Sequence, residues 1–435
     1  MLIFRFHRQA FLFFFLIAPV QASVLVSPEF STHVQQDSPS DKEFRKGVDA
    51  LLKSRLDEAE HAFLNSAKLN PNTAAPLLGL ADIELKKKQP DKAAKWLAAA
   101  DKAEPRSEQV RLAWGRYYRN QKNDSRAEVM LKESIAIKPS ASAYLELAQL
   151  YLADEKSSRA ALEMSKKAVS LSPTNPLVHH ILAISLAANG LSDDAILEFE
   201  RVARLTPKDP EPWRAIGRLH AEKNRFSLAT AALDKGIKLQ PFHYDLLIDR
   251  GDIAMAQNKW GEAGRFYETA AKQRPASAVL LTKLGWLYYI TQQAQKSEKA
   301  YKQAIQLEPN VPDSYNNLAW VILSDPTRQN EALKLSEKAN QIAPNNPLYL
   351  DTLGWIHHLR GDDTKAEQIF RKAINFKPEL PDIHHHLGMI YVTQGRKGEA
   401  ISAFTRALEL NPSFTFASDA KKHLTQLMQQ ESTRR

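Results

Sequence analysis

The histidines are the first residues in this sequence that could do chemistry. Three consecutive histidines, His384, His385 and His386, follow a pair at His357 and His358. Imidazole is a common metal ligand, but successive helical side chains point about 100° apart, so one helix cannot direct three neighbouring imidazoles at one ion. His358 and His385 could face each other from adjacent helices as a two-ligand site. Since zinc usually needs three or four protein ligands, we predict no metal site.

Paired carboxylates are the second candidates for chemistry. Asp193-Asp194 and Asp362-Asp363 each stand between two helical patterns, where carboxylate oxygens cap a helix start by accepting its free N–H groups. The sequence has no phosphate-binding glycine loop, dinucleotide fingerprint, zinc-protease motif or nucleophile elbow. No stretch of about 100 residues remains outside the repeats for a fused enzyme domain. We therefore predict no catalytic residue, no enzyme activity and no cofactor.

A proline that ends a helical pattern sets the organisation of the chain. It recurs every 34 residues from Pro71 to Pro309, and after one extra residue near Ser324–Thr327 it returns at Pro344, Pro378 and Pro412. Proline stops a helix because it lacks the N–H and clashes with the preceding turn. Between Pro347 and Pro378, two apolar helical faces flank a break at Gly361. Neither helix could bury its face alone, so the unit needs neighbours.

This pattern resembles the tetratricopeptide repeat family, whose period is 34 residues. In residues 381–414 the signature positions hold His384, Leu387, Gly388, Tyr391, Gly395, Ala400, Phe404, Ala407 and Pro412. The first two units depart most, with Ser66 in place of alanine and Glu84 in place of an aromatic residue. The resemblance covers residues 40–414 and implies an all-α fold. We expect a right-handed solenoid of about eleven helical hairpins, a capping helix at 415–430 and a tail at 431–435.

Three tryptophans are the candidates for ligand binding. Trp286, Trp320 and Trp355 each follow the small signature residue of their unit. By the resemblance, this face of the first helix lines a concave groove, and tryptophan and tyrosine are favoured interface anchors. Alternatively, each tryptophan packs against the next unit. The residues predicted to bind a partner in the groove are Lys283, Trp286, Tyr289, Asn316, Asn317, Trp320, Asp351, Trp355, His358, His385 and Met389.

The groove of the sixth and seventh units is charged rather than aromatic. The sixth unit places Arg214 and Arg218 on this face, and the seventh places Asp245, Asp249 and Asp252 there. We favour salt bridges between the adjacent units over a charged binding surface. The Lys/Asn/Arg clamp with which co-chaperone repeats hold a terminal carboxylate does not occur in this sequence.

The first 22 residues have the architecture of a secretory signal peptide. Arg5 and Arg8 precede an apolar run, and Val20-Gln21-Ala22 is a cleavage pattern of small residues. The alternative is an uncleaved anchor, but the run is shorter than the roughly 18 apolar residues of a span. We expect cleavage before Ser23, a linker at 23–39 and no stable membrane span afterwards. The chain has no cysteine, which excludes a lipoprotein anchor and disulfides.

The net charge of +9 raises the question of nucleic acid as a partner. Lysine and arginine stand mostly among acidic residues rather than in a basic block, so we predict no nucleic-acid binding.

The stretches Asn316–Trp320 and Asp351–Trp355 resemble the C-terminal repeat arrays of bacterial exopolysaccharide-export and PEP-CTERM-associated proteins. That resemblance implies an exported, periplasmic, non-catalytic scaffold. Its partners would be proteins of the envelope or polysaccharide-export machinery. The alternative is a glycan-binding protein that stacks sugar rings on its tryptophans.

Overall fold

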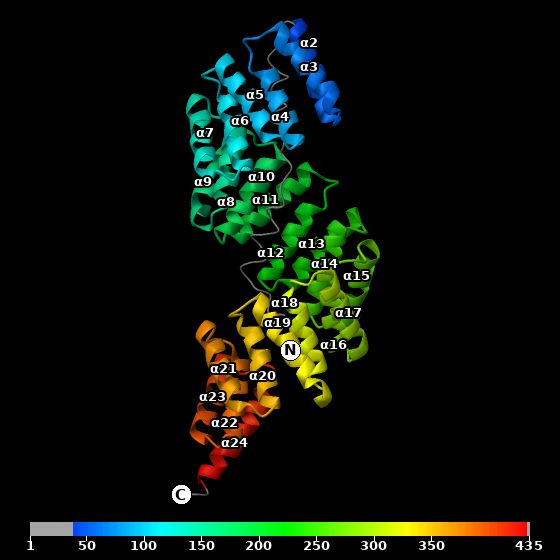
Figure 1. Ribbon diagram of the computed structural model, residues 1–435, viewed down its shortest axis with the longest axis vertical. Coiled ribbons are helices and arrows are strands. Elements are labelled where there is room, and N and C mark those ends of the chain that lie inside the picture. The colour runs from blue at the N-terminus through cyan, green and yellow to red at the C-terminus, as the bar shows by residue number, and fades with distance from the viewer. Residues whose placement is uncertain (1–37, 433–435) are drawn as a thin grey trace. The chain divides into compact units, whose positions relative to one another are not determined.

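The computed structural model describes residues 38–432, and over this range the chain is α-helical without a β-strand. The described residues divide into two compact units, one ending at Leu219 and the other beginning at His220. Helices within each unit succeed one another as antiparallel hairpins (Figure 1). The all-α solenoid predicted from the proline spacing is therefore confirmed.

The first unit contains five hairpins. Their helices are α2 (Pro39–Leu52), α3 (Leu56–Leu69), α4 (Ala75–Lys86), α5 (Pro90–Ala103), α6 (Glu108–Asn120), α7 (Asp124–Ile137), α8 (Ala141–Leu152), α9 (Ser158–Leu171), α10 (Pro176–Ala188) and α11 (Ser192–Leu205). A 3-10 turn, η2 (Glu155–Ser157), lengthens the fourth hairpin. The next helix, α12 (Glu211–Glu222), contains the division between the units.

The second unit continues the same pattern. Its remaining helices are α13 (Phe226–Leu239), α14 (Tyr244–Ala256), α15 (Trp260–Gln273), α16 (Ala278–Ile290), α17 (Ala294–Leu307), α18 (Pro312–Ile322), α19 (Gln329–Ile342), α20 (Pro347–Leu359), α21 (Asp363–Phe376), α22 (Pro381–Thr393), α23 (Lys397–Leu410) and α24 (Ala417–Ser432). The 3-10 turn η3 (Pro326–Arg328) lies at the predicted extra residue. The predicted capping helix is α24, which packs on α23.

Several predicted segments fall outside the structural description. The proposed signal peptide and most of the linker precede residue 38, and α2 begins at Pro39 after a cap formed by Ser38. Residues 433–435 of the predicted tail also lie outside the described residues. Within 38–432, no helix is both long and apolar enough to cross a membrane.

A small residue recurs where the two helices of each hairpin meet. On the second helix, the position occupied by Ala366 is alanine or serine in eleven hairpins and is fully buried in each: Ala59, Ala93, Ala127, Ala161, Ala195, Ala229, Ala263, Ser297, Ala332, Ala366 and Ala400. One turn later, the same helix projects a large side chain toward the first helix in most hairpins, while Ser165 and Ser336 occupy this position on α9 and α19. Where this side chain meets a glycine, a Cβ built on that glycine would lie within 3 Å of it.

The ring of Phe404 against Gly388 shows this contact in the last hairpin. A Cβ on Gly388 would come 2.8 Å from the Phe404 ring, which is itself fully buried. Phe370 and Gly354 repeat the arrangement in the preceding hairpin at 2.9 Å. These glycines are therefore required by close approach of the helices rather than by backbone conformation.

Ser66, one of the two departures from the repeat signature, has a structural reason. Its hydroxyl donates to the backbone carbonyl of Ser40 on α2 at 3.0 Å, deep in the first hairpin. A buried hydroxyl is tolerated when it is hydrogen-bonded, and here its bond joins the two helices of the hairpin.

We predict that Gly388→Val destabilises the last hairpin by about 1–3 kcal/mol, the usual cost of overpacking a core. The matched control is Gly398→Val on α23, where a Cβ meets nothing within 4 Å. Native-state hydrogen exchange measures both. Because repeats contact mainly their neighbours, protection should fall in α22–α24 and persist in α2–α7. Equal loss in both regions, or equal effects of the two substitutions, would contradict this packing account.

Candidate ligand-binding groove

The predicted groove residues lie on the first helices α16, α18, α20 and α22 (Figure 1). The indole N–H of Trp320 donates to the hydroxyl of Tyr289 on the preceding first helix at 2.9 Å. Trp286 stacks on Tyr289 with ring centroids 5.5 Å apart and is only 6% exposed. Trp320 is half-buried. The three aromatic side chains thus form one cluster that joins two successive hairpins.

Trp355 joins the next pair of hairpins. Its ring stacks on His386 of α22, with centroids 4.6 Å apart and planes inclined by 28°. His358 of its own helix lies 4.9 Å away. Trp355 is half-buried, so part of its surface stays accessible beside these imidazoles. The tryptophan therefore both packs against the next repeat, as one interpretation predicted, and contributes to the surface of the first helices.

The two histidines proposed as a ligand pair are bonded elsewhere. His358 Nδ1 lies 2.6 Å from a carboxylate oxygen of Asp363. His385 bonds through Nε2 to Asp419 of α24 at 2.9 Å, and its ring stacks on Phe416 at 4.9 Å. Burial, followed by the neighbouring His386, lowers the pKa of His385 to about 4. Within residues 38–432, no group of three or more histidines and carboxylates is arranged to hold a metal ion.

Lys283, one of the predicted partner-binding residues, is bonded within the chain. Its ammonium donates to both carboxylate oxygens of Asp252 on α14, each at 2.8 Å, and both side chains are buried. Asp252 also accepts from the hydroxyl of Tyr267 at 2.6 Å. Asp252 of α14 therefore holds the Lys283 ammonium inside the fold, and Tyr267 of α15 in turn holds Asp252. The salt bridges predicted from α12 to α14 would cross between the two units and stay a prediction.

One other predicted groove residue carries a polar atom without a partner. Asn316 and Asn317 on α18 are 0% and 2% exposed. Asn317 bonds to the Tyr301 side chain, whereas Asn316 Oδ1 has no hydrogen-bond partner in the described residues. A buried polar atom without a partner costs about 1–3 kcal/mol, so the Asn316 amide indicates a missing donor. Met389 of α22 is half-buried against the core of the last two hairpins.

Two buried carboxylates, Asp351 and Asp382, lie on the neighbouring first helices α20 and α22. Asp351 is 4% exposed and accepts from His386 Nδ1 at 2.8 Å. Asp382 is 5% exposed, and its Oδ1 has no hydrogen-bond partner in the described residues. Burial, followed by the charge of Asp351, raises the pKa of Asp382 to about 6. Asp382 stands one turn before His386 on α22, so both buried carboxylates lie near this imidazole.

The sequence pattern predicted Asp351 as a groove residue but not Asp382, and it did not predict the bond of His386 to Asp351. A signal existed in the spacing. Asp252 and Lys283, which pair across adjacent first helices, are 31 residues apart, and so are Asp351 and Asp382. Because Asp351 and Asp382 are both acidic, this spacing indicates two negative charges on adjacent first helices instead of an ion pair.

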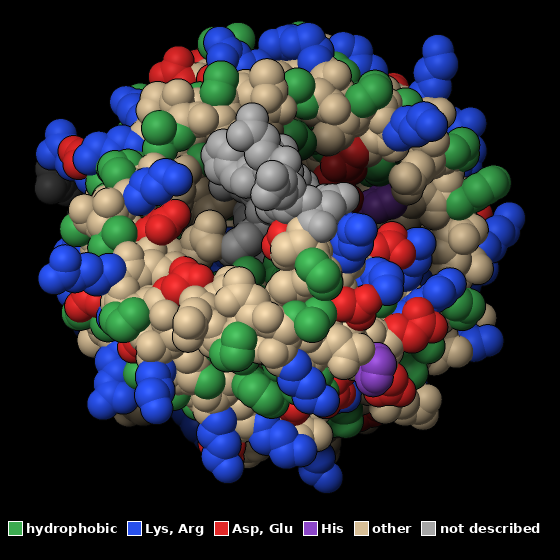
Figure 2. All heavy atoms as spheres, turned by 90° about the horizontal axis from the view of Figure 1, so that it is seen from above, with side chains coloured by type: hydrophobic (Ala, Val, Ile, Leu, Met, Phe, Trp, Pro, Cys, Tyr) green, Lys and Arg blue, Asp and Glu red, His purple; other side chains and the backbone are tan. Residues whose placement is uncertain are grey.

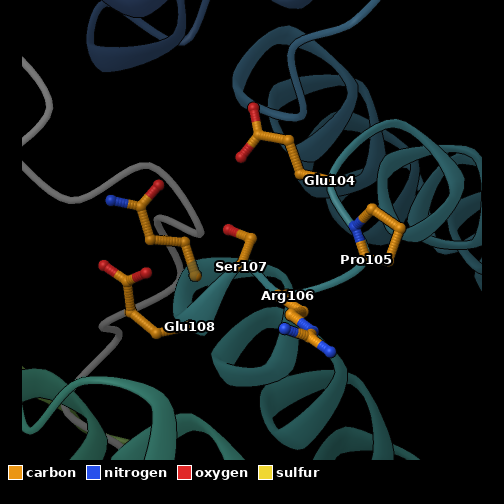
Figure 3. Close-up of a pocket in the computed structure, with 6 residues that line it drawn as sticks. Glu104, Pro105, Arg106, Ser107 and Glu108 are labelled. Carbon is orange, nitrogen blue, oxygen red and sulfur yellow. The ribbon is translucent and has the colours of Figure 1, made fainter.

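In the first unit, a buried carboxylate on a first helix has cationic partners. Glu146 of α8 is 1% exposed and lies between two arginines of the preceding first helix, with Arg116 at 2.6 Å. A surface depression elsewhere in this unit is lined by Glu104–Gln109, the connection from α5 to α6 (Figure 3). There Ser107 caps α6, and Glu104 accepts from the backbone of Ala74 at 2.8 Å. These polar groups serve the turn, and the depression carries no convergent site.

The outer charges agree with the absence of a basic block in the sequence. On the face shown in Figure 2, lysine and arginine side chains are interspersed with acidic and apolar ones. A mixed surface of this kind is typical of solvated helices rather than of a nucleic-acid interface.

The comparisons with known proteins decide the family. Three family models, each described as Tetratricopeptide repeat, match residues 381–414, then 44–108 with 145–278, and then 278–311 with 349–380. Together they cover more than half of the chain. The chain belongs to the tetratricopeptide repeat family.

Its relatives share the repeat over limited lengths. The chain is 27% identical over 165 residues to the TPR repeat-containing protein PA4667 of Pseudomonas aeruginosa, covering 38% of this chain and 28% of that protein. It is 26% identical over 200 residues to anaphase-promoting complex subunit 3 of Schizosaccharomyces pombe, covering 38% and 30%. The tetratricopeptide chain therefore spans less than a third of either curated relative.

A solved structure supports the fold alone. The crystal structure of the APC/C hetero-tetramer Cut9-Hcn1 is similar to this tetratricopeptide chain with a TM-score of 0.51 and 14% identity. The similarity covers 90% of this chain and 96% of that one.

We predict that Asp382→Asn removes a pH-dependent loss of stability. A folded-state pKa of about 6 lies above the ordinary value of about 4, so the folded protein holds the proton more tightly. Burial of Asp382 therefore does not lower the free energy of unfolding below about pH 4, where the carboxyl is protonated. The loss of stability develops as the pH rises from about 4 to about 6. Relative to the native protein, the variant should gain up to about 3 kcal/mol between pH 4 and pH 7.

Urea denaturation at the two pH values measures this gain. Glu379→Gln, at an exposed residue of the preceding connection, is the charge-matched control. A gain for Asp382→Asn that is the same at both pH values would show that its carboxylate is not held in an unfavourable environment.

Proposed function

We propose that this tetratricopeptide chain is a non-catalytic scaffold that binds protein partners along the first helices of its second unit. One observation carries the proposal: Asn316 Oδ1 on α18 and Asp382 Oδ1 on α22 are buried polar atoms without hydrogen-bond partners in the described residues, both on first helices of the second unit. Buried polar groups in proteins are nearly always hydrogen-bonded. The N–H and C=O groups of a polypeptide laid across these helices would supply the missing partners. Half-buried Trp320 and Trp355 beside them would supply apolar contact.

Protein fits this surface better than glycan does. A sugar ring stacks on an open aromatic face, but the Trp355 ring lies against His386 and His358. Trp286 is buried against Tyr289. The tryptophans therefore do not present a ladder of free faces, whereas a peptide needs only their exposed edges and the neighbouring amides. This observation favours the scaffold over the glycan-binding alternative.

We propose that the protein acts in the periplasm. The basis is the amino-terminal pattern of Arg5 and Arg8, an apolar run and Val20-Gln21-Ala22. The resemblance of Asn316–Trp320 and Asp351–Trp355 to exopolysaccharide-export repeat arrays adds envelope or polysaccharide-export proteins as the proposed partners.

The export proposal predicts a mature amino terminus at Ser23. Signal peptidase cuts after small residues at the end of such a leader. N-terminal sequencing of the protein recovered from the periplasm should begin at Ser23, and replacing Ala22 with a bulky residue should block the processing. Recovery of a chain with the Met1 terminus in the membrane fraction would contradict the proposal.

The binding proposal predicts that Trp320→Ala and Trp355→Ala weaken partner capture. Loss of an interface anchor costs about 2 kcal/mol or more, which is over tenfold in affinity. Partners are captured on the immobilised protein from solubilised envelope and identified by mass spectrometry, with a parallel capture of envelope glycans. The matched control is Trp96→Ala, which removes a half-buried tryptophan from the second helix α5.

Thermal melting of each variant separates binding from folding. We expect capture to fall for both groove variants at temperatures where they remain folded, and to persist for Trp96→Ala. Retained capture by the folded groove variants, or capture of glycan in place of protein, would overturn the proposed function.

A further inference from the structure

Within the described residues, the carboxylates of Asp351 and Asp382 lack the lysine or arginine partner that Asp252 and Glu146 have on other first helices. Asp252 is held by Lys283, and Glu146 by Arg116 and Arg119. In contrast, neither Asp351 nor Asp382 forms an ion pair with a lysine or arginine of the described chain. A buried charge without a partner is strongly unfavourable. The fold therefore holds a charge imbalance here that the pairs of Asp252 and Glu146 do not have.

The single imidazole at this site cannot restore the balance. His386 uses Nδ1 to donate to Asp351 Oδ1, and its ring is fixed between Trp355 at 4.6 Å and Phe416 at 5.2 Å. Even a charged imidazole would neutralise one carboxylate and leave the other. Asp382 Oδ1 remains an acceptor without a donor. The site therefore lacks a hydrogen-bond donor that carries positive charge.

The surroundings restrict what that donor is. Asp351 and Asp382 are 4% and 5% exposed, so the charged group must reach below the surface of the first helices. Lysine carries a compact ammonium with three donors on a flexible four-carbon stem. The arginine guanidinium is a wide planar fork that matches a carboxylate best when both of its oxygens are free. Since Asp351 already gives Oδ1 to His386, a point-like ammonium fits the remaining acceptors better.

We propose that Asp351 and Asp382 form a recessed pocket for a lysine side chain of the protein partner. The inference rests on the proposed function, since it names the group that a bound polypeptide inserts between α20 and α22. The ammonium donates to Asp382 Oδ1 and to Asp351, and the lysine stem runs past the accessible edge of Trp355. Specificity for a cationic segment follows, because only a positive group repays the burial of both carboxylates.

The test uses the purified protein and a library of short random peptides on beads. Peptides that the protein binds should be enriched in lysine at one position. The best binder is then resynthesised with norleucine or arginine replacing that lysine, and binding is measured by calorimetry. We expect about thirtyfold or more weaker binding of the norleucine peptide, as for the loss of one member of a buried charge pair.

Two isosteric variants assign this preference to the pocket. Asp351→Asn and Asp382→Asn should each reduce the distinction between lysine and norleucine, and the double variant should abolish it. Glu379→Gln removes the same charge from an exposed position of the preceding connection and should leave the distinction intact. Circular dichroism melting confirms that each variant is folded at the temperature of the binding measurement.

The outcomes separate this inference from the function on which it rests. Peptide binding without lysine enrichment, or with a preference that survives in the double variant, overturns the lysine pocket and leaves the scaffold function standing. A stronger preference for arginine also overturns it. Absence of peptide binding together with absence of protein capture from the envelope overturns the proposed function itself.

Discussion

The close contact between a large side chain of one helix and a small residue of its partner is the constraint on which this structure depends. Phe370 against Gly354 and Phe404 against Gly388 leave no room for a Cβ. The contact sets the distance between the two helices of a hairpin. That distance determines which side chains stay exposed on the hairpin and can pack against the next repeat. The fifth hairpin accommodates Ala183 with Phe199, both fully buried, so the spacing is set hairpin by hairpin.

A consequence of regular stacking is that side chains about 30 residues apart meet. Glu146 with Arg116, Glu298 with Arg328 and Glu367 with Arg396 all pair at this separation. The ion pair of Arg328 lowers the pKa of Glu298 to about 2, which shows how strongly a matched neighbour stabilises a carboxylate. Where both positions are acidic, as at Asp351 and Asp382, the same geometry raises a pKa instead. Repetition of one hairpin therefore produces ion pairs that stabilise neighbouring repeats. At Asp351 and Asp382 it produces the site for which we propose a lysine of the partner protein.

The sequence was sufficient to predict the helical hairpins but not the contacts among the groove residues. Proline spacing and the small signature residues predicted the repeats because those features act within one hairpin. The bond of Lys283 to Asp252 was not predicted, because it depends on the offset between α14 and α16, which no local pattern encodes. The hydrogen bond between His386 and Asp351 and the position of Asp382 were missed for the same reason. Their importance arises from a contact between hairpins, whereas their own positions in the repeat signature are unremarkable in sequence.

A double-mutant cycle at Gly354 and Phe370 tests the central claim most directly. Gly354→Val, Phe370→Ala and the double variant are compared by denaturation, which isolates the coupling between the two positions. The account predicts that Gly354→Val is destabilising when the ring is present and costs little or nothing once Phe370→Ala has removed it. An equal cost of Gly354→Val in both backgrounds would contradict the claim that this contact sets the spacing of the helices.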